Sequence, residues 1–140
     1  MPTVAASREL LASREDVWAF LAQPERFADW WPDIGVVQPD RRGLAPGARW
    51  QIRGRERPRL VRRPEASGVM LILEVEPPRR LTWQLTGDRI DVELELEETA
   101  PERTRATLAI SAPWLTGLRR SFAVRALGRL HALCQTGAES

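Results

Sequence analysis

Alternating apolar and polar positions in the second half of the sequence predict neighbouring β-strands. Apolar side chains occupy every second position in residues 81–86, 90–97 and 105–110. Successive side chains of a strand point to opposite faces, so each stretch has one apolar and one polar face. Four acidic residues form the polar face of the middle stretch: Asp91, Glu93, Glu95 and Glu97. We expect this row on a sheet exterior, opposite threonine and arginine, where each pair contributes about 0.2–1 kcal/mol.

The C-terminal stretch 115–136 has helical periodicity instead. Its polar positions recur at spacings of four, three and three residues, at Arg125, Arg129, Ala132 and Gln135. The other positions form a broad apolar arc: Phe122, Ala126, Leu130 and Leu133 on one flank, and Val124, Leu127 and Cys134 on the other. An ordinary surface helix has an apolar face of about 100°. The wider arc predicts a helix that is gripped by a concave sheet.

The first third of the chain predicts a strand and two short helices. Residues 3–11 read as the strand, and Ser13 is a candidate N-cap that precedes two acidic residues. A second short helix is expected to begin at Pro24 and to extend to about Trp30. Further strands are expected at 34–37, around Trp50 and Ile52, and at 69–76, with a loop or ragged hairpin over 54–68.

Length and cysteine content limit the fold. A chain of 140 residues is most simply one domain, residues 1–140, and buries enough surface to fold without a disulfide or a metal. Cys134 is the only cysteine, which excludes an intrachain disulfide. The first residues hold no apolar core of signal-peptide length, and the aliphatic run Val69–Leu73 is too short to span a membrane. We therefore expect a cytoplasmic protein without stable membrane insertion.

Charge and motif content exclude several functions. The segment Arg41–Arg63 has nine arginines and one acid, but only one aromatic residue, Trp50, and no nucleic-acid-binding motif. A salt-bridged surface is therefore favoured over a nucleic-acid footprint. The sequence has no nucleotide-binding glycine motif, serine nucleophile elbow or metal-ligand spacing. We accordingly expect no nucleic acid, no cofactor and no metal.

Three segments carry a resemblance to a known family: Ser13–Ile34 (SREDVWAFLAQPERFADWWPDI), Pro46–Trp50 (PGARW) and Glu74–Leu85 (EVEPPRRLTWQL). With the order of elements, they resemble the START-like or SRPBCC superfamily, the polyketide cyclase/dehydrase and lipid transport group. The resemblance implies an α+β helix-grip fold, in which a curved antiparallel sheet wraps a long C-terminal helix around a hydrophobic cavity. Its known uses include binding of lipids, quinones or hormones, polyketide cyclisation and stimulation of a chaperone ATPase.

Candidate ligand-binding residues follow from parity and from the resemblance. Trp50 and Trp83 share the parity of the inward aliphatic residues, so each either lines a cavity or fills the core. By the resemblance, Trp30 and Trp31 lie near the cavity mouth. At least one of this pair is expected to be partly exposed, because helix neighbours point about 100° apart. The full set of candidates is Trp30, Trp31, Trp50, Trp83, Leu94, Leu108, Phe122, Leu127 and His131.

Several ionisable residues have two interpretations. His131, the only histidine, lies at the edge of the apolar arc, where a structural role is favoured but contact with a polar ligand group is open. Cys134 reads as a buried apolar residue or, less favoured, as a thiolate activated by His131. Arg8 shares the parity of the apolar residues of its strand, where it needs a carboxylate partner from the protein or from a ligand. The favoured interpretation is instead a position at the frayed end of the strand. Arg53 and Arg55 face outward if their strand is regular, whereas a bulge would turn one of them to cap the pocket and pair with a ligand carboxylate or enolate.

Three functions remain in order of preference. The first is binding of a small, mostly hydrophobic molecule between sheet and helix, with a homodimer possible. The second is a polyketide cyclase or dehydratase in the same cavity, which would need an ionisable pair such as His131 and Arg8. The third is an interaction protein that resembles chaperone-ATPase activators and uses Arg41–Arg63.

Overall fold

The fold is one antiparallel sheet with helices on one of its faces. The computed structural model describes residues 3–31, 34–54, 67–85, 89–112 and 120–139. Within these ranges seven strands pair in the order β1-β7-β6-β5-β4-β3-β2. The elements are β1 (Thr3–Leu10), α1 (Arg14–Leu21), η1 (Pro24–Arg26), α2 (Phe27–Trp30), β2 (Ile34–Gln38), β3 (Arg49–Gly54), β4 (Ser67–Glu76), β5 (Arg80–Leu85), β6 (Ile90–Ala100), β7 (Arg103–Ser111) and α3 (Arg120–Glu139).

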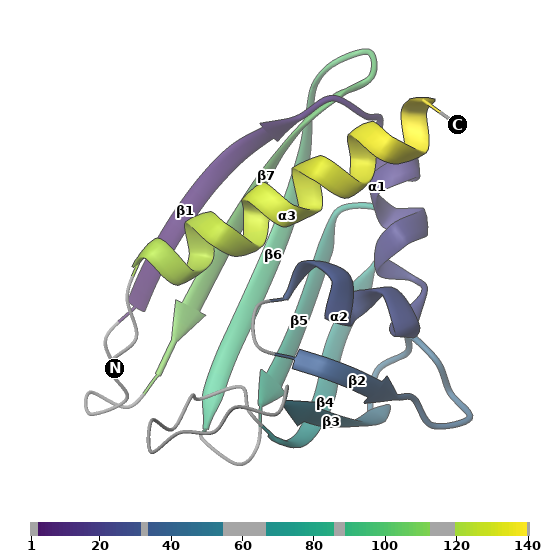
Figure 1. Cartoon of the computed structure of the whole chain (residues 1–140), viewed down its shortest axis with the longest axis vertical. Coiled ribbons are helices and arrows are strands. Elements are labelled where there is room, and N and C mark those ends of the chain that lie inside the picture. The colour runs from purple at the N-terminus through teal and green to yellow at the C-terminus, as the bar shows by residue number, and fades with distance from the viewer. Residues whose placement is uncertain (1–2, 32–33, 55–66, 86–88, 113–119, 140) are drawn as a thin grey trace.

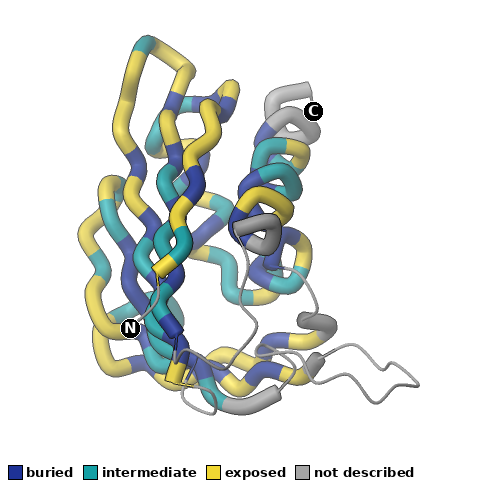
Figure 2. The backbone as a smooth tube through the Cα atoms, turned by 90° about the vertical axis from the view of Figure 1, so that its left-hand side faces the viewer, coloured by how far each residue is buried: buried dark blue, intermediate teal, exposed yellow. Residues whose placement is uncertain are grey.

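The sheet curves around the long helix. Figure 1 shows α1, α2 and α3 on the same face of the sheet, with β2 and β3 turned steeply relative to β1. Viewed from the side in Figure 2, the strands form one layer and α3 stands opposite them. The predicted α+β helix-grip fold is therefore confirmed.

The predicted start of the first helix is confirmed in detail. The Ser13 side chain accepts a hydrogen bond from the backbone N–H of Asp16 at 3.2 Å. Glu15 and Asp16 lie in the first turn, where carboxylates suit the positive end of the helix dipole. The predicted second helix is divided into a 3₁₀ turn, η1, and one α-helical turn, α2.

The alternation in the last three strands matches the two faces of the sheet. The inward residues of β6 are buried, whereas its acidic residues lie on the outer face. Arg80 on β5 forms ion pairs there with Glu93 at 2.8 Å and with Glu74 at 3.1 Å. The Arg80 guanidinium lowers the pKa of Glu93, and the hydrogen bond between the two carboxyls raises the pKa of Glu95. The acidic row is thus an exterior charge network, and no metal-ligand cluster occurs among the described residues.

The apolar face of α3 is narrower than the sequence pattern predicts. Its buried residues are Ala123, Ala126, Leu127, Leu130 and Cys134, whereas Val124 is 48% exposed. This spacing of three and four residues is that of an ordinary one-sided helix. The predicted wide arc was wrong because α3 packs chiefly along the edge strand β1, which leaves one of its flanks in solvent.

The other boundaries differ by a few residues at most. The predicted loop over 54–68 is shorter at both ends, since β3 includes Gly54 and β4 begins at Ser67. Residues 55–66 lie outside the described part, and with them residues 55–63 of the Arg41–Arg63 segment. In the portion of the chain that is described, no helix has the length and apolar character needed to cross a membrane.

Candidate ligand-binding site

Four of the predicted site residues belong to one aromatic cluster, which we define as Phe27, Trp30, Trp31, Trp50 and Trp83. Phe27 stacks on Trp31 with ring centroids 5.5 Å apart and contacts the other three rings edge to face. Trp83 also meets Trp30 at 6.2 Å and Trp31 at 5.5 Å. All four tryptophans are at most 1% exposed. The cluster joins η1–α2 to the inner faces of β3 and β5 as tightly packed core.

The expected exposure of Trp30 or Trp31 was wrong. Trp30 ends α2, and Trp31 is its C-cap in an extended conformation with φ −82° and ψ 119°. The two residues are therefore not neighbours on a regular helix. The chain turns at Trp31, so both rings face inward and meet edge to face at 5.6 Å.

The indole nitrogens of the cluster differ in their surroundings. Trp50 donates its ring N–H to the carbonyl oxygen of Gly43 at 2.9 Å, which anchors the turn before β3. The ring N–H of Trp83 is buried and finds no hydrogen-bond acceptor among the described residues. An unsatisfied buried donor costs about 1–3 kcal/mol. The cluster is thus held by ring burial more than by polar contacts.

The predicted leucines lie where sheet and helix meet. Leu94 and Leu108 are directly opposite each other on the inner faces of β6 and β7, and both are 0% exposed. Leu127 on α3 is 1% exposed. Phe122 belongs to α3, but its side chain lies outside the described part. These three leucines pack in the core, with almost no surface accessible to water.

Polar groups enter this interior at the contact between β1 and α3, which we call the α3–β1 seam. On β1, Arg8 lies on the inner-face register between Ala6 and Leu10, which are both buried, yet its own side chain is exposed. On α3, His131 is half-buried. Burial lowers the pKa of His131, and the positive charge of Arg8 lowers it further. Arg8 of β1 is therefore close enough to His131 of α3 to act on its charge, at the rim of an apolar core.

Neither polar group of the seam has a carboxylate partner in the described ranges. The ion pairs found there join Arg79, Arg80 and Arg103 to glutamates, and none involves Arg8 or His131. The sequence identified Arg8 as a candidate because it occupies an inward-facing position of its strand, where its charge needs a partner. The sequence named His131 and Arg8 as an ionisable pair for the cyclase alternative, and the structure gives an electrostatic interaction between them.

Cys134 is unreactive because it lies on the buried face of α3. The thiol is 1% exposed, and burial together with the charge of Asp16 raises its pKa to about 11. A thiol with this pKa is protonated at neutral pH and is a poor nucleophile. The interpretation of Cys134 as a buried apolar residue is therefore confirmed, and its raised pKa argues against activation by His131.

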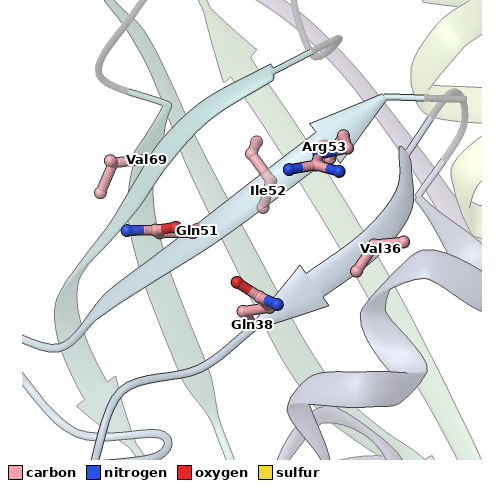
Figure 3. A pocket seen from close by; sticks show the side chains of 6 residues that line it. All are labelled: Val36, Gln38, Gln51, Ile52, Arg53 and Val69. Carbon is pink, nitrogen blue, oxygen red and sulfur yellow. The ribbon is translucent and has the colours of Figure 1, made fainter.

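A concavity lies on the outer face of the sheet, opposite to the face that carries the helices. Its volume is about 230 Å³. Figure 3 shows the side chains of β2, β3 and β4 that line it: Val36, Gln38, Gln51, Ile52, Arg53 and Val69. Arg53 faces outward as predicted and is exposed, whereas Arg55 lies outside the described part. Apart from Ile52 and Val69, the lining residues are exposed, so the hollow is a shallow surface feature.

A curved antiparallel sheet around one C-terminal helix, with an apolar inner face and polar groups at one rim, defines a protein of the helix-grip class. The chain belongs to the family described as polyketide cyclase / dehydrase and lipid transport, whose sequence model matches residues 1–137. The predicted membership is thus confirmed. Among curated proteins, no match was found.

Solved structures share the fold at low sequence identity. NE0264 from Nitrosomonas europaea is 20% identical with a TM-score of 0.70, covering 99% of this chain and 97% of that one. DynU16, from the dynemicin biosynthetic locus, is 22% identical with a TM-score of 0.69, covering 96% of this chain and 48% of that one. The Aha1 dimer from Colwellia psychrerythraea is 16% identical with a TM-score of 0.65, covering 97% and 96%. At these identities the likeness concerns the fold alone.

Proposed function

We propose that the protein binds one small, mostly hydrophobic molecule, a lipid, a quinone or a polyketide-like compound, between the sheet and α3. The observation that carries the proposal is the α3–β1 seam, where small apolar residues are bordered by His131 and Arg8. Such a combination of apolar walls and a few polar groups is typical of small-molecule sites. The description of the family, which names lipid transport and polyketide chemistry, supports the same class of ligand.

The composition of the seam supports uptake by local opening. Its buried side chains include three alanines, Ala6 of β1 and Ala123 and Ala126 of α3. An alanine buries little apolar area, and each buried CH₂ group contributes only about 0.8 kcal/mol. Segments with little buried area open at low free energy, and ligand-binding elements are drawn from such segments. In this proposal α3 moves relative to β1, and the ligand inserts beside Leu94, Leu108 and Leu127.

Native mass spectrometry and an uncharged fluorescent probe, N-phenyl-1-naphthylamine, test the proposal. We expect one bound molecule per chain and probe binding that weakens at least about tenfold in Ala126→Leu, since 1.4 kcal/mol of lost contact has this effect. The matched control is Ala109→Leu, which makes the same change on the outer face of β7. Absence of any adduct or probe binding would contradict the proposal, as would equal weakening by the two variants.

A second candidate is a cyclase or dehydratase in the same place. The pairing of His131 with Arg8 favours it, because lowering of the pKa of His131 keeps the imidazole neutral and able to accept a proton. The imidazole would take a proton from a carbon next to a substrate carbonyl, and the guanidinium of Arg8 would stabilise the resulting enolate oxygen. With a linear poly-β-ketone thioester mimic, His131→Gln should lose formation of the dehydrated ring while it retains binding.

A role as a chaperone-ATPase-activator-like protein stays a third possibility without a specific observation in its favour. The neighbour titled an Aha1 dimer shares the fold alone. Only residues 41–54 of the proposed Arg41–Arg63 surface are described, and they include the exposed Arg41, Arg42, Arg49 and Arg53. This role would require partner binding that weakens with salt and needs no ligand.

A further inference from the structure

We propose that the α3–β1 seam selects a ligand with a single carboxylate, which binds to the Arg8 guanidinium beside His131 while its apolar chain lies between α3 and the sheet. The inference rests on the proposed function and adds the chemistry of the head group. Arg8 recognises the charge of the carboxylate head group, and the neutral imidazole of His131 donates a hydrogen bond to the same group.

The position of Arg8 sets the place of the head group. Arg8 is opposite Ala106 in the β1–β7 register, and Ala106 is 0% exposed on the inner face. The stem of Arg8 therefore starts above the core, while its guanidinium is accessible to solvent. A long side chain of this kind keeps its charge in water and its methylene groups on apolar surface. A ligand bound to the guanidinium would have its polar end at the rim and its tail directed inward.

The charges around the seam favour an anion. Arg8 forms no ion pair with a carboxylate among the described residues, and no acid is among the causes that shift the pKa of His131, whereas Asp16 of α1 acts on Cys134. Guanidinium and carboxylate form paired, charge-assisted hydrogen bonds. The neutral imidazole of His131 adds a ring N–H donor without adding charge.

One positive charge matches a monoanion better than a dianion. A carboxylate is neutralised by Arg8 alone, whereas a phosphate monoester carries about −1.5 to −2 charges at pH 7 and would remain partly unpaired. An alcohol of the same chain length would lose the charge-assisted contact. The seam should therefore prefer the carboxylate over both.

The experiment titrates the protein at 0.15 M salt with dodecanoate, dodecanol and dodecyl phosphate, which share one alkyl chain. We expect dodecanoate to bind up to about fivefold more tightly than dodecanol, because an exposed ion pair contributes about 0.2–1 kcal/mol. Arg8→Gln should remove this preference and leave dodecanol binding unchanged within about twofold. The matched control is Arg105→Gln, which removes the same charge from the outer face next to Ala106.

The NMR signal of the single histidine supplies an independent readout. A carboxylate held beside His131 should raise the pKa of the imidazole, whereas dodecanol should leave it unchanged. Equal binding of dodecanoate and dodecanol, or equal loss in Arg8→Gln and Arg105→Gln, overturns the carboxylate inference and leaves the proposed function standing. Failure of all three alkyl compounds and of the uncharged probe overturns both.

Discussion

The two ends of the interior are packed with side chains of different size and type. At one end, the aromatic cluster joins η1–α2 to β3 and β5 through large rings that are almost completely buried. At the other end, the α3–β1 seam joins α3 to β1 through alanines and leucines, with Arg8 and His131 at its rim. A buried tryptophan removes about 150–250 Å² from water, several times the area of an alanine side chain. The aromatic cluster is thus the stable half, and the seam is the half suited to open.

The largest expected effect tests the stable half. Trp83→Ala should lower the free energy of unfolding by about 3–5 kcal/mol, since it removes a ring that contacts three others and leaves a cavity. Urea unfolding measures this loss. Leu73→Ala on the outer face, where the side chain is 42% exposed, is the control and should change stability little. A folded Trp83→Ala protein with ordinary stability and altered ligand uptake would assign Trp83 to the site instead.

Alkylation of Cys134 measures closure of the seam. A pKa of about 11 in place of the usual 9.0 lowers the thiolate fraction near neutral pH about a hundredfold. Reaction with iodoacetamide should be slower than that of a free thiol by at least this factor, and its rate should still be rising with pH above 9. A rate that levels off near pH 9 would indicate an exposed thiol and a seam that is already open.

Hydrogen exchange compares the two halves directly. Backbone amides of α3 should exchange at least about tenfold faster than those of β5 and β6, because segments that bury less area open at lower free energy. Bound ligand should slow exchange in α3 and leave the strands unchanged. Equal protection of α3 and β5 without ligand would show that the seam is as firmly closed as the aromatic cluster.

The smallest effect concerns the pH dependence of stability. Burial and the charge of Arg8 lower the folded-state pKa of His131, so the folded protein binds this proton less readily than the unfolded chain does. The stability contributed by the neutral imidazole is therefore fully present above about pH 6.5 and is lost as the pH falls through the folded-state value. His131→Gln should flatten this part of the profile. NMR titration of Arg8→Gln should place the pKa of His131 between the wild-type and unfolded values. An unchanged pKa would show that Arg8 does not act on His131.

Much of the fold could be predicted from local pattern. Alternation identified β5, β6 and β7, and the Ser13 N-cap identified the start of α1 within the described structure. The width of the apolar arc of α3 was wrong, since Val124 is apolar but exposed. The helical pattern shows which residues can be buried. Which of these residues are buried depends on the element against which the helix packs. For the same reason Trp31, which appeared to continue a helix, turns inward as a cap.

The sequence by itself determined the order of strands and helices and the inner and outer face of each strand, because side-chain periodicity follows from backbone geometry alone. Only the tertiary structure decided which residues interact across the chain: the tryptophans pack into one closed cluster, and the charge of Arg8 on β1 acts on His131 of α3. These contacts join residues far apart in the chain. They depend on sheet curvature and on the strand over which α3 lies, and neither is encoded in any short stretch of sequence.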